Sequence, residues 1–223
     1  MGVAEQRNMY LRQLDILKPE VCNMPITLIG AGATGSFTAL ALAKMGIHDI
    51  TVYDADTVEE HNFPNQLFPI NALGINKAIA LYELVHMYTG YKIKPVPHMF
   101  TEKNEVSGIV ICALDSMKGR RMIYKMCAGN PKVNLLIDPR CGAEVCRVLT
   151  MTPELKSSCE KYKATLHSDD KADPTPCTAR SIIYSVLTVS SLICNQVKRY
   201  LMNQELRTDM LMDLSTHFSY FDK

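Results

Sequence analysis

Residues 26–54 read ITLIGAGATGSFTALALAKMGIHDITVYD. The run predicts a short apolar strand, a Gly-x-Gly-x-x-Gly turn, a helix and a second strand that ends on an acid. Gly30 permits the tight turn, Gly32 lets the backbone approach a phosphate, and Gly35 lets the helix pack against the strand. Asp54 lies 19 residues beyond Gly35, where a carboxylate accepts hydrogen bonds from ribose hydroxyls. The pattern predicts an adenine-nucleotide site, and the alternative is an ordinary strand–helix turn without a ligand.

The rest of the chain continues the alternation of strands and helices. Residues 107–113 are a continuous apolar run, typical of a strand buried on both faces, and a helical pattern over 116–128 follows it. This order predicts an α/β fold with a doubly wound, mostly parallel, Rossmann-like sheet. Further strands are expected at 92–100, 133–137, 143–151 and 210–221, with antiparallel pairing at the C-terminal end, and further helices at 4–18, 71–89 and 178–202.

A chain of 223 residues fits one nucleotide-binding domain spanning 1–223. Within it we expect an N-terminal helical arm over 1–20 and a mobile crossover loop over the polar stretch 155–176.

Charge and cysteine content narrow the function classes. The chain has 24 basic and 23 acidic residues, which gives no indication of a nucleic-acid or membrane surface. The residues from 1 to 19 do not resemble a secretory signal, and the longest apolar run, 181–194, is shorter than a membrane span. None of the eight cysteines forms a Cys-x-x-Cys pair, so we expect reduced thiols in the cytoplasm and no structural zinc.

Several short motifs follow the same order as in a known family. They are YLRQ at 10–13, the glycine turn, DADTV at 54–58, GINK at 74–77 and CALDS at 112–116. Together they resemble the ThiF-type family of ubiquitin-activating enzymes and of adenylyltransferases in molybdopterin and thiamine biosynthesis. The resemblance covers residues 9–140 and weakens afterwards.

The resemblance implies roles for residues around the expected nucleotide. Asp54 binds the ribose, and Asp56 belongs to the same segment. Asn62 donates its amide to phosphate oxygens without adding charge, and Gln66 also matches the family. Arg12 reaches into the nucleotide site of a partner subunit, where a guanidinium fork suits a polyphosphate. Asn62 as a turn residue and Arg12 as an exposed helix arginine are the alternatives.

Two more residues are implied to take part in catalysis. Lys77, at the first turn of a helix, would stabilise negative charge at the α- and β-phosphates. A cation there is disfavoured by the helix dipole unless an anion is near. Asp115 follows the buried strand 107–113, at the strand end where α/β sheets bind ligands, and is the family's magnesium position. The alternatives are a surface lysine and a helix N-cap.

Two positions leave the reaction open. Where the family expects an arginine three residues after Asn62, the chain has Asn65, so one phosphate-binding cation is absent from its usual place. Cys177, in a Pro-Cys-Thr element near Arg180, is a candidate for thioester formation, with packing against the sheet as the alternative.

The resemblance therefore implies an ATP- and Mg²⁺-dependent adenylyltransferase that works as a homodimer. A carboxylate attacks the α-phosphorus, pyrophosphate leaves, and an acyl adenylate forms. The carboxylate would be the C-terminal glycine of a ubiquitin-like or sulfur-carrier protein. Thioester formation or sulfur transfer could follow. A non-catalytic scaffold with the same fold, supported by Asn65, and an NAD-dependent oxidoreductase are the alternatives.

Overall fold

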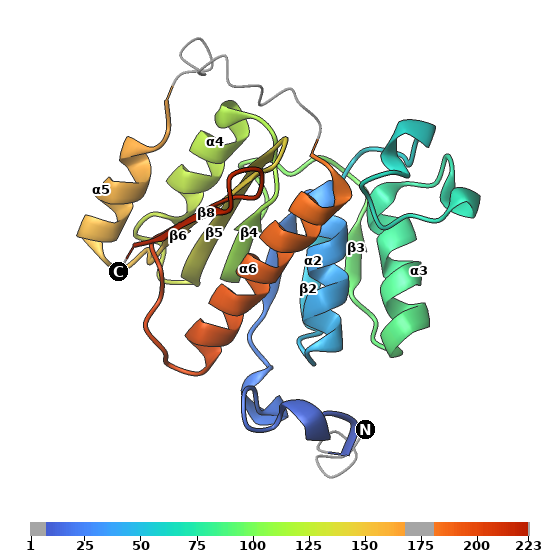
Figure 1. Cartoon of the computed structure of the whole chain (residues 1–223), viewed down its shortest axis with the longest axis horizontal. Coiled ribbons are helices and arrows are strands. Elements are labelled where there is room, and N and C mark those ends of the chain that lie inside the picture. Colours follow the sequence, from blue (N-terminus) through green and yellow to red (C-terminus); the bar gives the residue numbers. More distant parts are fainter. Residues whose placement is uncertain (1–7, 168–180, 223) are drawn as a thin grey trace.

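A computed structural model of the chain describes residues 8–167 and 181–222 (Figure 1). One eight-stranded sheet in the order β3-β2-β1-β4-β5-β6-β7-β8 forms its centre. The strands are β1 (Ile26–Ile29), β2 (Ile50–Tyr53), β3 (Lys94–Val96), β4 (Gly108–Cys112), β5 (Val133–Gly142), β6 (Val145–Met151), β7 (Asp209–Asp213) and β8 (Phe218–Phe221).

The sheet changes character at β5. Strands β3, β2, β1, β4 and β5 pair in parallel, whereas β5 through β8 pair antiparallel. The strand order reverses between β1 and β4, the kind of point at which open α/β sheets bind ligands. The predicted fold class, including antiparallel strands at the C-terminal end, is confirmed.

Helices cover both faces of the sheet and divide the core in two. Residues of α2, α3 and α6 belong to one apolar cluster, and residues of α4 and α5 belong to the other. Figure 1 shows α2 and α6 crossing the same face side by side. The helices are α2 (Ala33–Lys44), α3 (Lys77–Thr89), α4 (Met117–Cys127), α5 (Lys156–Ala164) and α6 (Ile183–Leu201), with short 3₁₀ turns at Leu11–Gln13, Pro19–Val21, Glu60–Asn62 and Ile70–Ala72. None of the helices in the described ranges is long and apolar enough to cross a bilayer.

Three segments differ from the sequence-based expectations. The expected loop over 155–176 contains α5, because Cys159 and Tyr162 are three residues apart and form a buried face on an otherwise polar helix. The expected last strand is a hairpin of β7 and β8. The described part of the N-terminal arm holds short 3₁₀ turns in place of a long helix.

Candidate functional site

The glycine turn after β1 is shaped by close backbone contacts. Gly30 has φ of +100°, and a Cβ there would lie 2.4 Å from the carbonyl oxygen of Ala113. A Cβ on Gly35 would lie 1.9 Å from the carbonyl oxygen of Gly30. At Gly32, by contrast, a Cβ would meet nothing within 4 Å, and α2 starts there without a side-chain cap. The turn is therefore tight underneath and open at the helix N-terminus, as an anion site requires.

Asp54 joins the end of β2 to this turn. Its Oδ2 accepts from the backbone N–H of Ala31 at 2.6 Å, and its Oδ1 accepts from the N–H of Asp56 at 2.9 Å. Burial raises the pKa of Asp54, although both N–H groups and the charge of Lys77 act in the opposite direction. Each carboxylate oxygen has a second lone pair with which to accept a hydroxyl group.

Lys77 lies beside the same two acids. Its Nζ is 3.2 Å from Oδ2 of Asp56, and its side chain is only 10% exposed whereas that of Asp56 is 72% exposed. Asn76 caps α3 and donates its amide to the carbonyl oxygens of Asp54 and Asp56, both at 3.0 Å. The structure thus brings Asp54, Asp56 and Lys77 together. Asp56 supplies the anion that a cation at a helix start requires.

The segment between β2 and α3 carries three amide side chains of interest. Oδ1 of Asn62 accepts from the N–H of Glu59 at 2.9 Å, in a capping box of the 3₁₀ turn Glu60–Asn62. Oε1 of Gln66 is buried and has no hydrogen-bond partner among the residues that the structure describes. Asn65 donates its amide to the carbonyl oxygen of Ser181 at 2.9 Å, so it anchors the chain just before α6. Asn62 therefore takes the turn role, and the unsatisfied Gln66 oxygen is the atom here that lacks a donor.

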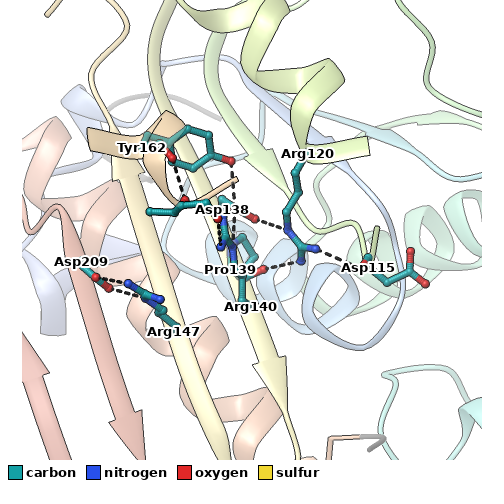
Figure 2. Close-up of polar contacts among 9 residues, drawn as sticks. Asp115, Arg120, Asp138, Pro139, Arg140, Arg147, Tyr162 and Asp209 are labelled. Atoms are coloured by element: carbon teal, nitrogen blue, oxygen red, sulfur yellow. Dashed lines mark hydrogen bonds and ion pairs between the residues drawn. The ribbon is translucent and has the colours of Figure 1, made fainter. Parts of the chain in front are cut away.

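Asp115 follows β4 and is exposed. Ser116, and not Asp115, caps α4, since its hydroxyl accepts from the N–H of Gly119 at 3.1 Å. The Asp115 carboxylate makes no hydrogen bond or ion pair within the described ranges and points away from its neighbours in Figure 2. Only its backbone oxygen is bound, by NH1 of Arg120 at 3.1 Å. The N-cap alternative is therefore wrong, and the carboxylate is available to a ligand.

A buried charge cluster that the sequence did not predict lies next to Asp115 (Figure 2). Oδ1 of Asp138 accepts from Nε of Arg120 at 2.9 Å, and its Oδ2 accepts from Arg140 at 2.9 Å and from the Tyr162 hydroxyl at 3.0 Å. Asp138 is wholly buried. Arg140 also donates to the carbonyl and hydroxyl oxygens of Thr165 at 3.0 and 2.9 Å. One carboxylate thus holds two guanidiniums and ties β5 to α4 and α5.

The sequence does carry a signal for this cluster. Asp138, Pro139 and Arg140 directly follow the apolar run of β5, and a charge at that place in a buried strand needs a partner. The partners come from α4 and α5, and α5 was not expected.

Arg12 lies apart from these residues. It is exposed and lines a hollow of about 480 Å³ together with Ala43, Lys44 and Tyr88, at the C-terminal end of α2. The glycine turn is at the other end of that helix, whose 12 residues are about 18 Å long. Arg12 therefore does not join the nucleotide site of its own chain.

Two further expectations concern the cysteine and the metal. Cys177 lies outside the described residues. Within the ranges 8–167 and 181–222, no three His, Cys, Asp or Glu side chains gather into a metal-binding group. Asp115 is thus the available carboxylate of the site, a donor set that suits Mg²⁺, which keeps several waters and shares its ligands with substrate phosphates.

Comparison with known proteins decides the family, since the ThiF family matches residues 13–219. The chain belongs to the ThiF family. Among curated ThiF-related proteins, the adenylyltransferase and sulfurtransferase MOCS3 of Dictyostelium discoideum is 29% identical over 123 residues, 51% of this chain and 29% of that protein. This ThiF member therefore spans about three tenths of the length of MOCS3.

Solved structures share the ThiF fold over almost the whole chain. A crystal structure of PaaA superimposes with a TM-score of 0.77 at 16% identity, covering 98% of this chain and 73% of PaaA. A crystal structure of E. coli MccB with ATP gives a TM-score of 0.74 at 14% identity, covering 97% of this chain and 71% of MccB. At these identities the likeness shows the ThiF fold alone.

Proposed function

We propose that this ThiF protein is an ATP- and Mg²⁺-dependent adenylyltransferase that activates a carboxylate as an acyl adenylate. The observation that carries the proposal is the convergence of Asp54 and Lys77 beside an open glycine turn. Both come from different elements and meet where the sheet order reverses. The curated relative MOCS3 is named an adenylyltransferase, and MccB has been solved with ATP.

Each residue has a role that its surroundings support. The turn at Gly32 and the N-terminus of α2 bind phosphate oxygens, and Asp54 accepts hydrogen bonds from the ribose. Lys77 neutralises charge at the phosphates, with Asp56 keeping its ammonium group in place in the free protein. The buried Oε1 of Gln66 accepts from a ligand donor. Positioning and charge neutralisation then drive attack on the α-phosphorus without a side-chain nucleophile.

Asp115 would hold Mg²⁺. Its carboxylate is exposed and unpaired, while Arg120 fixes the backbone of its turn. The bound cation supplies charge stabilisation for the leaving pyrophosphate. Because the chain provides a single carboxylate here, the remaining ligands would be water and phosphate oxygens.

The substrate of the proposed reaction is the C-terminal glycine of a ubiquitin-like or sulfur-carrier protein. MOCS3 is named a sulfurtransferase as well as an adenylyltransferase, which supports a sulfur-carrier partner. Cys177 remains a proposed acceptor for a thioester. We further propose that the enzyme resides in the cytoplasm.

The distant position of Arg12 favours a homodimer. Arg12 lies at the opposite end of α2 from the glycine turn, so it would serve a nucleotide site only on a second copy. Sedimentation velocity should show two copies. Arg12→Gln should weaken ATP binding although it is remote from the turn of its own chain, and unchanged affinity would exclude Arg12 from the site. Lys44→Gln, in the same hollow, is the matched control and should leave ATP affinity unchanged.

The test of the proposal is a calorimetric titration of the full chain with ATP and Mg²⁺, with NAD⁺ in parallel. We expect ATP to bind and NAD⁺ not to bind. Lys77→Gln should weaken ATP binding by roughly tenfold, equivalent to about 1.4 kcal/mol. Lys132→Gln is the control, because Lys132 is 64% exposed and pairs with Glu105 elsewhere on the surface. Binding of NAD⁺ alone would replace the proposal with an oxidoreductase.

Asn65 favours a second candidate, a non-catalytic ThiF scaffold. Its amide is committed to Ser181, so it does not replace the arginine that the family places there. Failure to bind either nucleotide would favour the scaffold.

A further inference from the structure

Two cysteines face each other across the hairpin of β5 and β6. Cys141 pairs directly with Cys146 in the antiparallel ladder, and their sulfur atoms are 3.9 Å apart. Opposite residues in such a ladder have Cα atoms about 4.5 or 5.5 Å apart. Both values lie within the range of about 4.4–6.8 Å that a disulfide spans, so a bond needs side-chain rotation and no backbone movement.

The two thiols also differ in environment. Cys141 is half-buried, whereas Cys146 is buried against α6, where its thiol lies 3.2 Å from the carbonyl oxygen of Ser185. Cys146 has one S–H, so it donates either to Ser185 or to Cys141. When Cys141 loses its proton, the Cys146 S–H can turn toward the new thiolate.

We propose that Cys141 and Cys146 form a redox modification site, in which Cys141 reacts with a peroxide and Cys146 then closes an intrachain disulfide. None of the roles in the proposed adenylation reaction uses either residue. In a reducing compartment, a pair that forms such a bond is typically catalytic or redox-sensing.

The reaction balances with hydrogen peroxide as the oxidant. The Cys141 thiolate attacks one peroxide oxygen and the O–O bond breaks, which gives a sulfenic acid and hydroxide. The sulfur of Cys146 then attacks the sulfenic sulfur, the S–S bond forms, and water leaves. Two thiols and one peroxide become one disulfide and two waters.

The acid–base properties of the pair agree with this order of events. Hydrogen bonding from Cys146 lowers the pKa of Cys141 to about 7 against the effect of burial, and the side chain of Ser181 contributes further. The same hydrogen bond raises the pKa of Cys146. Other buried thiols have raised pKa values, about 11 at Cys22 and about 12 at Cys194, because of burial. Cys141 is thus the better nucleophile among these sites.

Trypsin gives a direct test, because residues 141–147 form one peptide that contains both cysteines, between Arg140 and the end of Arg147. The full chain is treated with hydrogen peroxide, digested and weighed by mass spectrometry. We expect this peptide to lose the mass of two hydrogen atoms and to regain it with dithiothreitol. A peptide that stays reduced while other cysteines oxidise, or one cross-linked to another cysteine, would overturn the proposal.

Variants assign the order of the two steps. Cys146→Ser should leave a sulfenic acid on Cys141 that dimedone captures, whereas Cys141→Ser should leave Cys146 reduced. Cys194→Ala, the control at a buried thiol on α6, should form the disulfide as the wild type does. Circular dichroism confirms that each variant is folded. Dimedone labelling of Cys146 in Cys141→Ser would contradict the assigned order.

The pH dependence gives a second readout. With its lowered pKa, Cys141 should react less than about twofold faster at pH 8 than at pH 7, against roughly eightfold for an ordinary thiol. A roughly eightfold rise would exclude Cys141 as the attacking thiolate.

Discussion

Asp115 and Asp138 occupy comparable positions at the ends of neighbouring strands, yet their surroundings are opposite. Asp138 is wholly buried and binds two arginines and a tyrosine. Asp115 is exposed, and its carboxylate binds nothing among the described residues. Arg120 connects them, since it pairs with the carboxylate of Asp138 and holds the backbone of Asp115.

The difference separates a residue that builds the site from one that serves it. A buried charge with all its partners in place fixes the positions of β5, α4 and α5, and losing one partner is costly. An exposed carboxylate on a fixed turn contributes little to folding and is available to a ligand. Stability measurements should therefore divide the two residues sharply.

Asp138→Asn should have the largest effect. It leaves the buried Arg120 and Arg140 without a carboxylate, and we expect a loss of about 3–5 kcal/mol in the free energy of unfolding in urea. Asp209→Asn is the matched control, because Asp209 also binds an arginine, Arg147, through both oxygens but in a more exposed place. It should cost about 1 kcal/mol or less. Equal losses in the two variants would contradict the structural role of Asp138.

Tyr162→Phe should come next. It removes only the hydroxyl that donates to Asp138, and a buried hydrogen bond to a charged group is worth about 1.5–3 kcal/mol. Tyr124 stacks on Tyr162 with ring centroids 5.8 Å apart, and Tyr124→Phe provides the control. Urea midpoints that are the same for both variants would show that the hydroxyl does not support the cluster.

Asp54 should show an intermediate, pH-dependent effect. Burial raises its pKa in the folded state above the unfolded value of about 3.9. Relative to Asp54→Asn, its contribution to stability is therefore present below that value and lost as the pH rises through the folded pKa. Urea unfolding of both proteins at pH 4 and pH 7 should show the wild type losing ground to the variant. A difference that moves the other way would mean that the two N–H bonds outweigh burial.

Asp115→Asn should change the free energy of unfolding least, within about 0.5 kcal/mol. The exposed carboxylate has no partner to lose, whereas the backbone contact from Arg120 is kept. A loss as large as that of Asp138→Asn would show that Asp115 is part of the structural cluster.

Local sequence signals predicted one half of the site well. The glycine turn, Asp54 and Lys77 lie within a strand–helix unit and the segment after it, so their spacing fixes their meeting point. The position of Asp115 after β4 followed from the same logic of strand ends.

The rest depends on contacts that are distant in the sequence. Tyr162 reaches Asp138 from α5, a helix whose polar composition is typical of a loop and which forms because two residues pack on the sheet. The contact of Asn65 with Ser181 spans 116 residues and gives an apparent phosphate-site substitution a structural role. Tertiary packing, which no local pattern encodes, decides both.

The most direct test of the central claim is ATP affinity with and without Mg²⁺, measured by calorimetry for the wild type and for Asp115→Asn. We predict that Mg²⁺ tightens ATP binding to the wild type by roughly tenfold, about 1.4 kcal/mol, and has little effect on the variant. The same tightening in both proteins would contradict the assignment of Asp115 as the carboxylate that serves the ligand.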